Sequence, residues 1–504
     1  MDRTEVLIAG AGPTGLVLAL WLTRLGIHVR IVDKLAEPGT TSRAVAVQAR
    51  TLEFYAQLGL ADTIVERGRR AGAANLWVSR RRIAHLVLGD MGAGISPFPY
   101  ALIYPQDEHE RLLIECLAAL NVQVERETEL VSLEETGDGV VAQLRHADGR
   151  TTDCLASFAA GCDGAHSVVR EQLSIPFAGG TYEHLFYVAD VEAEGPALNG
   201  EVHVALDATD FIAVFPLNAD RRARLVGTIR DPNAKPASDW SWDDVGHQVI
   251  AWMDINVTRV RWFSTYRVHH RVAARFRSGR AFLLGDAAHI HSPVGGQGMN
   301  TGIGDAVNLG WKLAAVLRRA ADPAILGTYE TERIAFARRL VATTDQAFTA
   351  VTSSTWLART LRLHVVPRLL PWLTAFAAVR RLLFRTVSQT SIEYRGSWLS
   401  DGRADSVQGG DRLPFADNFV PLTALAWQAH VYGDATPAIH ALCAERRIPL
   451  HVFEWKPAMR RAGLRRHAFY LIRPDGYIGL AAVEQRPAIV AAYLDSRALR
   501  PALA

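Results

Sequence analysis

Three separated segments of this chain combine glycines with a carboxylate, the residue types that can hold a phosphorylated, hydroxyl-rich ligand. They are Gly10-x-Gly12-x-x-Gly15, Cys162-Asp163-Gly164, and Gly285-Asp286 followed by Gly295-Gly296-Gln297-Gly298. Glycines let a ligand touch the main chain, and carboxylates accept hydrogen bonds from its hydroxyl groups. We call these the three glycine segments and expect each of them to bind part of one nucleotide.

The first glycine segment lies between two predicted strands, Val6 to Ala9 and Val29 to Val32, with a predicted helix after the glycines. In such a unit the first glycine makes a tight turn, the second admits a pyrophosphate, and the third lets the helix pack on the strand. Asp33, directly after the second strand, can accept hydrogen bonds from a ribose. The pattern predicts a dinucleotide site formed by Gly10, Gly12, Pro13, Thr14, Gly15, Asp33 and Lys34.

The other two glycine segments also follow predicted strands. Leu155 to Ala160 ends at the second segment, and Ala281 to Leu284 ends at the third. Beyond the third, apolar residues recur on one helical face from Ile303 to Leu317. A helix that begins behind a glycine-rich loop offers unpaired N–H groups and the positive end of its dipole, so we expect an electron-rich ligand there.

Alternating, aromatic-rich strands are predicted between residues 176 and 277, and two shorter strands at Asn75 to Val78 and Ile83 to Leu88. A sheet inserted between pieces of a nucleotide-binding fold could roof a substrate pocket. Its candidate pocket residues are Tyr187, His203 and Phe215.

These patterns predict an α/β chain of three parts. Residues 1–75, 102–175 and 278–395 would form a Rossmann-like nucleotide-binding domain with trailing helices, and residues 76–101 and 176–277 a mixed substrate-binding sheet. Residues 396–504 read as β-α-β, a hairpin turning at Pro474-Asp475-Gly476, and a final helix, which suggests a thioredoxin-like domain. That part has no CxxC, so thiol redox exchange is not expected there.

Composition narrows the function classes. Net charge is only +3 and the arginines are scattered, which argues against a nucleic-acid partner. The four cysteines form no zinc or CxxC spacing and the chain opens on a strand, so we expect a cytoplasmic protein without a metal site or signal peptide. The apolar stretch from Leu369 to Val379 contains Pro371 and is too short to span a membrane, so we expect a buried or interfacial helix.

The order and spacing of the three glycine segments resemble the FAD-dependent aromatic hydroxylases, single-component flavoprotein monooxygenases typified by p-hydroxybenzoate hydroxylase. The branch with a C-terminal thioredoxin-like domain, which includes phenol hydroxylase and the aromatic polyketide hydroxylases, is more similar. The resemblance covers nearly the whole chain. One departure is Asp33, where many relatives have Glu.

The resemblance implies that the first segment and Asp33 hold the ADP half of FAD, with Arg43 and Gln106 near its ribose, pyrophosphate or ribityl chain. Asp163 would serve both FAD and NAD(P)H, and Asp286 would bond a ribityl hydroxyl. Main-chain N–H groups would face the pyrimidine edge of the flavin. The cofactor residues implied by the third segment are Gly285, Asp286, Pro293, Gly296, Gly298, Met299 and Asn300.

The resemblance also implies a reaction. NADPH or NADH reduces FAD, O2 adds to give a C4a-hydroperoxide, and its distal oxygen hydroxylates a phenolic or polycyclic aromatic substrate. Pro293 and Gly295 would line the pocket beside the flavin, with Pro293 and His291 as candidate catalytic residues. His289 fits a structural role better, and the base that deprotonates a phenol stays open, as does a homodimer.

Three alternatives remain at this stage. A flavin-dependent halogenase would need a W-x-W-x-I-P sequence, but Trp240-Ser241-Trp242 is followed by Asp243-Asp244-Val245. A flavin-dependent reductase or oxidase would place no oxygen atom in its product. A non-catalytic FAD-binding protein would show no turnover that depends on substrate.

Overall fold

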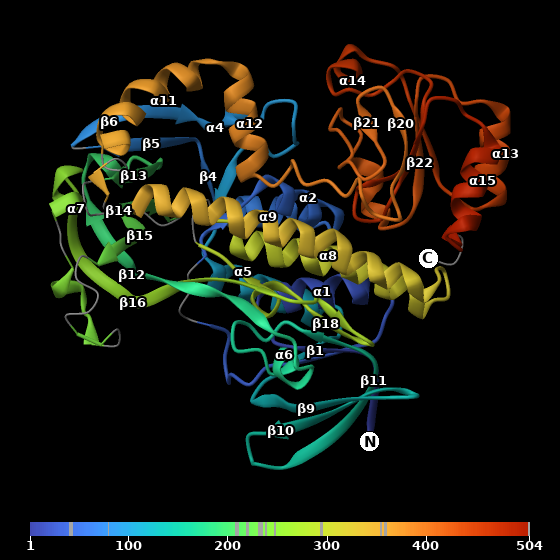
Figure 1. The fold of residues 1–504 in the computed structure, drawn as a ribbon, viewed down its shortest axis with the longest axis horizontal. Coiled ribbons are helices and arrows are strands. Elements are labelled where there is room, and N and C mark those ends of the chain that lie inside the picture. The colour runs from blue at the N-terminus through green and yellow to red at the C-terminus, as the bar shows by residue number, and fades with distance from the viewer. Residues whose placement is uncertain are drawn as a thin grey trace.

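The computed structural model describes residues 1–39, 44–78, 80–206, 211–217, 221–229, 235–236, 239–245, 248–292, 296–352, 355–356 and 360–501. Figure 1 shows three regions along the longest axis of the molecule. An inserted sheet lies at one end, the C-terminal part at the other, and the N-terminal sheet with its helices lies between them.

The central sheet has the strand order β17-β18-β11-β1-β2-β8, with β9 and β10 attached to β11. β1, β2, β8, β11 and β18 run parallel. Apolar residues buried on both faces form these strands, as parallel sheets require. The bounds are β1 (Asp2–Ala9), β2 (Val29–Val32), β8 (Val124–Glu125), β9 (Thr128–Thr136), β10 (Gly139–His146), β11 (Thr151–Gly161), β17 (Arg277–Ser278) and β18 (Ala281–Leu283).

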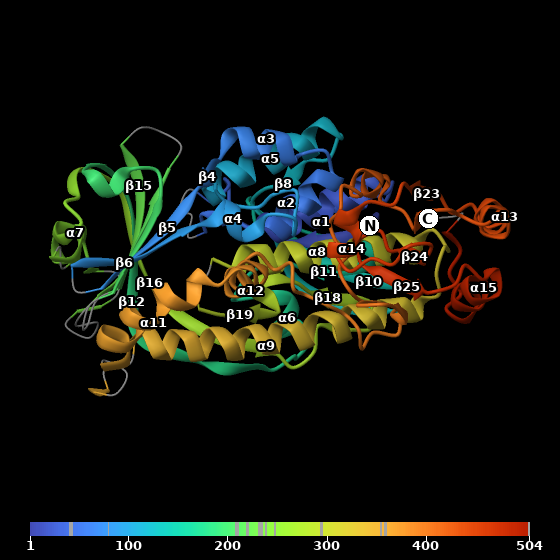
Figure 2. The ribbon, with the colours of Figure 1, turned by 90° about the horizontal axis from the view of Figure 1, so that it is seen from above.

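Helix α8 is the most buried helix beside this sheet. It packs on α1, where a Cβ placed on Gly310 would lie 3.2 Å from the Cβ of Trp21, so the two backbones approach closely. Figure 2 shows α9 running along one side of the molecule from the inserted sheet toward the C-terminal part. The helix bounds are α1 (Pro13–Arg24), α2 (Ala49–Gln57), α3 (Ala61–Arg67), α4 (Leu88–Gly92), α5 (Gln106–Ala119), α6 (Val168–Gln172), α8 (Gly298–Leu317) and α9 (Gly327–Thr352).

The inserted sheet has the order β19-β16-β12-β15-β14-β13-β5-β6, antiparallel except for the parallel pair β13 and β5. The predicted excursion near residue 75 therefore joins the predicted later strands in one sheet. A small sheet, β3 (Ala46–Val47), β7 (Ala101–Ile103) and β4 (Arg69–Ala71), lies at its junction with the central part. The bounds are β5 (Ala73–Val78), β6 (Arg81–Val87), β12 (Phe177–Glu194), β13 (Val202–Leu206), β14 (Phe211–Pro216), β15 (Arg222–Ile229), β16 (Asn256–Ala273) and β19 (His289–Ile290).

The two faces of the inserted sheet are covered differently. One face packs against the short helix α7 (Gln248–Trp252), through Leu185, Ala189 and Val191 of β12. The alternate residues Phe186 and Val188 belong to a second cluster on the opposite face. We call these the outer and inner faces, because inner-face residues of β13 and β14 continue into a cluster with Val45 and Ile103 of the central part.

A π-helical turn (Leu361–Val365), α11 (Val366–Ala375) and α12 (Ala377–Val387) follow α9. α11 lies against β6, and α12 against α4. The sequence predicted a buried or interfacial helix here, and the buried alternative is wrong, because Thr374 is the one buried residue among those of α11. Within the described ranges, no helix has the length and apolar character that a membrane crossing needs.

The C-terminal sheet has the order β21-β20-β25-β24-β22-β23. β22 and β23 are parallel around α13, and β24 and β25 form the antiparallel hairpin predicted at Pro474-Asp475-Gly476. The bounds are β20 (Asp401–Ala404), β21 (Val407–Gln408), β22 (Gln428–Tyr432), α13 (Pro437–Glu445), β23 (Leu450–Phe453), α14 (Pro457–Arg461), β24 (Phe469–Ile472), β25 (Ile478–Ala482) and α15 (Pro487–Ser496). All four cysteines of the chain are free thiols.

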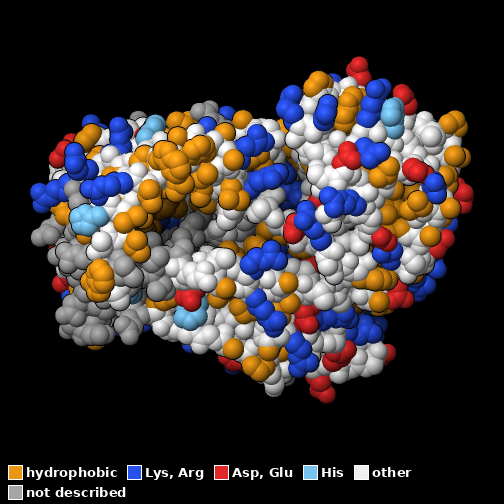
Figure 3. Space-filling view, turned by 45° about the horizontal axis from the view of Figure 1, so that its top comes forward, with side chains coloured by type: hydrophobic (Ala, Val, Ile, Leu, Met, Phe, Trp, Pro, Cys, Tyr) orange, Lys and Arg blue, Asp and Glu red, His pale blue; other side chains and the backbone are white. Residues whose placement is uncertain are grey.

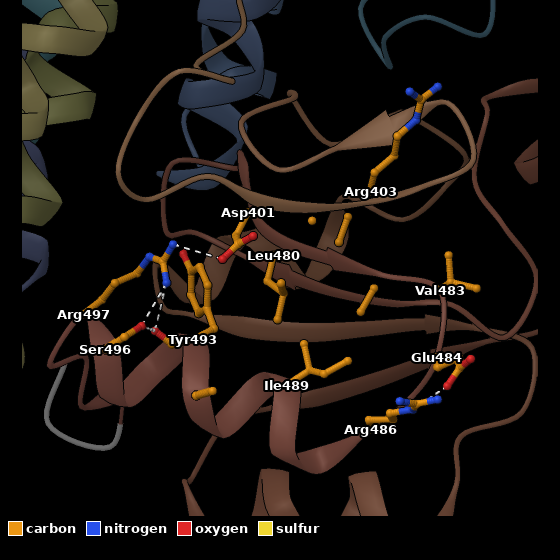
Figure 4. A pocket seen from close by; sticks show the side chains of 14 residues that line it. Asp401, Arg403, Leu480, Val483, Glu484, Arg486, Ile489, Tyr493, Ser496 and Arg497 are labelled. Carbon is orange, nitrogen blue, oxygen red and sulfur yellow. Dashed lines mark hydrogen bonds and ion pairs between the residues drawn. The ribbon is translucent and has the colours of Figure 1, made fainter.

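A groove of about 670 Å³ lies in this part, between β20, β25 and α15 (Figure 4). Four of its charged side chains form two pairs: Arg497 donates to Asp401 at 3.2 Å, and Arg486 pairs with Glu484 at 2.5 Å. The groove is formed by the C-terminal strands and helix and contains no residue of the three glycine segments.

His430 in β22 gives the chain a measurable acid sensitivity. It is fully buried between Gln428 and Tyr432, and burial lowers its pKa to about 3. Because the unfolded chain binds a proton near pH 6.5 and the folded chain does not, stability is lost as pH falls from about 6.5 toward about 3. At pH 5 this residue should cost about 2 kcal/mol of unfolding free energy.

Urea titrations between pH 7.5 and pH 5 check this expectation. The His430→Gln variant keeps a hydrogen-bonding side chain but cannot titrate, so its stability should fall less than that of the wild type. The exposed His440 supplies the matched control, His440→Gln, with an unchanged pH slope. Equal slopes for all three proteins would contradict the assignment.

Candidate functional site

The register of the central sheet brings the three glycine segments to one edge. Ala9 at the end of β1 pairs with Val32 on one side and with Gly161 on the other, and Gly161 pairs in turn with Leu283. Because these strands are parallel, the residues that follow them lie side by side. The sequence placed each segment at a strand end, and the sheet order now makes those ends neighbours.

The first and second segments touch directly at Gly10. A Cβ placed on Gly10 would lie 2.3 Å from the carbonyl oxygen of Cys162, and its φ of +100° is a conformation that favours glycine. A Cβ on Gly15 would lie 2.0 Å from the carbonyl oxygen of Gly10, so the helix α1 closes tightly on the loop. These positions tolerate no side chain.

The first and third segments touch at Thr14. Cβ atoms placed on Gly285 and Gly302 would lie 2.7 Å and 2.3 Å from Thr14 Oγ1. Thr14 thus packs against the turn after β18 and against the first turns of α8 together. Pro13 begins α1 as predicted.

The remaining space at this edge fits a large polar cofactor such as FAD. A Cβ on Gly12 would meet no atom within 4 Å among the described residues, in contrast to Gly10 and Gly15. Asp163 Oδ1 and His291 Nε2 are buried polar atoms that find no hydrogen-bond partner in the described part of the chain. Burial raises the pKa of Asp163, although hydrogen bonds from Ser167 and the main chain oppose the shift. An open glycine and unsatisfied acceptors are what a ligand with pyrophosphate and hydroxyl groups requires.

The carboxylate of Asp33 supports the first glycine segment. Its Oδ2 accepts a hydrogen bond from the Ala11 N–H at 2.7 Å and its Oδ1 accepts one from Leu35 at 2.9 Å. A carboxylate has about four acceptor sites, so these bonds leave capacity for ribose hydroxyls. Lys34 is exposed, and Gln106 at the start of α5 donates to Glu110 at 2.8 Å.

The N-terminus of α8 is held in place by Asn300. Its side chain makes four hydrogen bonds, accepting from Gln48 N–H and Thr51 Oγ1 and donating to the carbonyls of Ala46 and Gly296. The distances are 2.7 to 2.9 Å, so the amide is fully used. The first hydrogen bond inside the helix runs from Thr301 N–H to Gln297. The N–H groups of Gly298, Met299 and Asn300 come before this bond and therefore have no partner within the helix, as at any helix start.

A buried ionic cluster holds the turn after β18. Asp305 of α8 accepts from the Gly285 N–H at 3.0 Å, from His289 Nε2 at 2.7 Å and from Arg333 at 2.5 Å. Burial would raise the pKa of Asp305, but Arg333 and His289 hold it below the usual value. His289 is therefore a structural partner of Asp305, as its position in the sequence suggested.

His291 lies close to this helix start, as a Cβ on Gly298 would be 4.0 Å from its Nε2. Its Nδ1 donates to the Ser292 carbonyl at 2.8 Å, which leaves Nε2 as the acceptor of a neutral ring. Burial lowers the pKa of His291 to about 4, so the ring is neutral at pH 7.

The predicted pocket residues of the inserted sheet do not share one face. Phe215 lies on the inner face, with Phe186 and Trp262. Tyr187 packs on the outer face against Trp242 and Phe263, so it lies on the other face from Phe215. His203 also lies on the outer face, where it accepts a hydrogen bond from Trp77 at 3.1 Å. Arg43, Pro293 and Gly295 lie outside the described residues.

An inner-face ion pair was missed. Arg224 of β15 is buried and forms two hydrogen bonds to Asp190 of β12, at 2.7 and 2.8 Å. It also donates to the Ala44 carbonyl at 3.2 Å, which ties the inserted sheet to the segment after Asp33. The available signal was strand alternation, since Ala223 and Leu225 on either side belong to the outer cluster.

Asp286 is exposed at the edge where the segments meet. We expect Asp286→Ala to weaken FAD binding about 10- to 100-fold, because a ligand hydroxyl would lose a charged acceptor worth about 1.5 to 3 kcal/mol. Asp286→Asn keeps one acceptor oxygen and should lose less. Fluorescence titration of the stripped proteins with FAD measures both, and equal affinity of Asp286→Ala and wild type would exclude the role.

No group of three or more His, Cys, Asp or Glu suited to a metal ion occurs in the part of the chain that the structure describes.

Comparison with known proteins agrees with this geometry. The family described as FAD binding domain matches residues 3–344. The chain is 34% identical to a 6-methylpretetramide 4-monooxygenase of Streptomyces rimosus, over 96% of this chain and 91% of the relative. It is 33% identical to a pentachlorophenol 4-monooxygenase of Sphingobium chlorophenolicum, over 82% of this chain and 76% of the relative.

The fold is shared as well. The solved anhydrotetracycline hydroxylase of Streptomyces rimosus superposes with a TM-score of 0.79 at 29% identity, over 98% of this chain and 99% of that structure. The matched family, the named relatives and the convergence of the three glycine segments agree. The chain belongs to the FAD-dependent aromatic monooxygenases.

Proposed function

We propose that this monooxygenase hydroxylates a polycyclic aromatic phenol, with NAD(P)H and O2 as co-substrates and FAD held where the three glycine segments meet. The observation that carries the substrate class is the aromatic inner face of the inserted sheet. Its rings come from the three strands β12, β14 and β16 and are Phe186, Phe211, Phe215, Trp262 and Tyr266. A broad apolar wall suits fused rings, and the named relatives that act on pretetramide and anhydrotetracycline support this choice.

We assign the cofactor contacts as follows. Gly12 leaves room for the pyrophosphate, Asp33 and Asp163 offer acceptors to hydroxyl groups, and Asp286 does so at the third segment. When bound, FAD supplies hydride acceptance from NAD(P)H and the activation of O2. The start of α8 would stabilise negative charge on the flavin ring, because unpaired N–H groups and the helix dipole both point there.

We assign His291 a hydrogen-bonding role. A ring whose pKa lies near 4 is a weak base at pH 7, but its buried Nε2 can accept a hydrogen bond from substrate or cofactor. Pro293 and Gly295 remain predicted walls of the pocket.

The halogenase alternative loses further support. Trp242 of the incomplete W-x-W sequence packs on the outer face against Tyr187, with ring centroids 6.3 Å apart. That face is turned away from the three glycine segments.

We also propose the predicted three-part division and a thioredoxin-like C-terminal domain. The order β25-β24-β22-β23, with β22 parallel to β23 and antiparallel to β24, supports that fold. The inserted sheet begins at Ala73 and takes in β19 at His289–Ile290, a little beyond the predicted boundaries. Four free thiols support a reducing, cytoplasmic location.

A panel of phenols and fused-ring polyketides tests the function, with NAD(P)H consumption and incorporation of ¹⁸O from ¹⁸O2 measured for each. We expect fused-ring phenols to stimulate NAD(P)H oxidation several-fold and to gain one labelled atom. Stimulation by monocyclic phenols alone would refute the substrate class. NAD(P)H oxidation without label in any product would refute hydroxylation.

A further inference from the structure

The segment from residue 346 to residue 392 has no carboxylate, although the chain carries 52 acidic residues. It does carry six arginines: Arg359, Arg362, Arg368, Arg380, Arg381 and Arg385. Among the described residues, Arg368, Arg380, Arg381 and Arg385 form no ion pair with a carboxylate. Two of these guanidinium groups donate hydrogen bonds to main-chain carbonyls: Arg368 to His364, and Arg380 to Thr374 and Ala375. The segment therefore presents uncompensated positive charge.

The same segment presents an apolar stripe to solvent. Leu369, Trp372 and Leu373 occur at positions i, i+3 and i+4 of α11, which places them on one helical face, and Phe376 directly follows the helix. Trp372 is 61% exposed, and its ring packs edge-on against Phe376 with centroids 5.0 Å apart. We call these four residues the α11 stripe.

An amphipathic helix of a globular protein normally turns such a stripe toward the core. Here the polar Thr374 is the buried residue of α11 and the stripe faces outward. Nine of the seventeen large hydrophobic side chains that are exposed in the described residues lie between Trp356 and Val387. Figure 3 shows hydrophobic side chains gathered on this face beside a hollow, with basic side chains on either side.

We infer that this face docks on an anionic lipid bilayer, with the α11 stripe in the headgroup region and the arginines on the phosphates. Exposed Trp, Phe and Leu beside arginines are the composition of helices that lie in a membrane interface. Charge complementarity selects this occupant over a second copy of the chain. A twofold dimer through the same face would set arginines against arginines, without a carboxylate in the segment to pair them.

The position of α11 and α12 on the molecule gives membrane docking a function, whatever ring is hydroxylated. α11 rests on β6 and α12 on α4, beside the edge of the inserted sheet. Docking through these helices would hold the substrate-binding end of the molecule at the bilayer, where a planar apolar substrate concentrates.

Vesicle flotation of the FAD-loaded full-length protein tests the inference. The vesicles are phosphatidylcholine alone, or phosphatidylcholine with about one-third phosphatidylglycerol. We expect at least about tenfold tighter binding to the anionic vesicles at low salt, and weaker binding as salt is raised. Arg368→Gln/Arg381→Gln should lose about 30-fold, since each basic residue near an anionic surface contributes about fivefold. Trp372→Ser/Phe376→Ser should lose at least about tenfold on the same vesicles.

Retention of FAD and an unchanged thermal midpoint show that each variant is folded. Val420→Ser/Val452→Ser removes two exposed apolar side chains from the C-terminal part and is the matched control, with unchanged flotation expected. Wild-type protein that stays unbound at low salt overturns the inference. So does a concentration-dependent dimer that Trp372→Ser/Phe376→Ser abolishes while flotation is absent, which would assign the stripe to a second copy.

Discussion

The Gly12→Val variant is expected to fold like the wild type and to bind FAD at least about 100-fold more weakly. Gly12 faces open space among the described residues, so a side chain there collides with nothing in the protein itself. It would fill the room that a pyrophosphate needs. Losing two hydrogen bonds to a charged group costs about 3 kcal/mol or more, which is about 100-fold in the dissociation constant.

Far-UV circular dichroism and the thermal midpoint of flavin-free protein measure folding, and titration with FAD measures binding. Gly15→Val is the informative partner, because its Cβ would meet the Gly10 carbonyl at 2.0 Å and should disturb the fold itself. The two glycines thus separate a binding defect from a folding defect. Full flavin occupancy of Gly12→Val at wild-type affinity would remove the first glycine segment from the site.

The Glu332→Ala variant is expected to lose about 3 to 5 kcal/mol of unfolding free energy. Glu332 of α9 is fully buried and receives Lys312 at 2.8 Å and both Nη atoms of Arg473 at 2.8 and 3.0 Å. Asn308 and Ser397 donate to it at 2.6 Å each. Burial opposes the charge, but Arg473 and Lys312 keep the pKa of Glu332 well below its usual value. Removing the carboxylate leaves the buried Lys312 without its carboxylate partner and Arg473 with Asp475 alone.

Urea unfolding, followed by far-UV circular dichroism, measures the loss. Asp495→Asn removes one partner of the half-exposed pair with Arg446 and should cost less than about 1 kcal/mol. A similar small loss for Glu332→Ala would show that the buried cluster contributes little. Arg473 belongs to the C-terminal hairpin, so the variant should also loosen the C-terminal part from α8 and α9.

Many strands and turns of the central sheet were predictable, because short stretches of sequence determine where they begin and end. β2 has the predicted bounds, since Gly26 precedes it and a polar Asp33 follows it. The three glycine segments were recognised at strand ends, where backbone shape, rather than distant contacts, decides the residue type. That the three strand ends lie side by side follows from the order of the parallel strands in the sheet.

In the inserted sheet, the sequence does not predict which face of the sheet each side chain occupies. Both of its faces carry buried apolar clusters, so alternation separates the two faces but cannot say which one is the inner face. Tyr187 and Phe215 were therefore grouped as pocket candidates although they lie on opposite faces. Asn300 was predicted through its main-chain N–H, but its side-chain bonds reach residues about 250 positions away, which no local pattern reveals.

β19 carries a further consequence. Its two residues pair with Arg271 and Val272, near the end of the eighteen-residue strand β16 of the inserted sheet. The turn that follows β18 is therefore tied by strand pairing to the inserted sheet. A shift of β16 would therefore act on His289, the partner of Val272, and through it on Asp305 of α8, which His289 contacts at 2.7 Å.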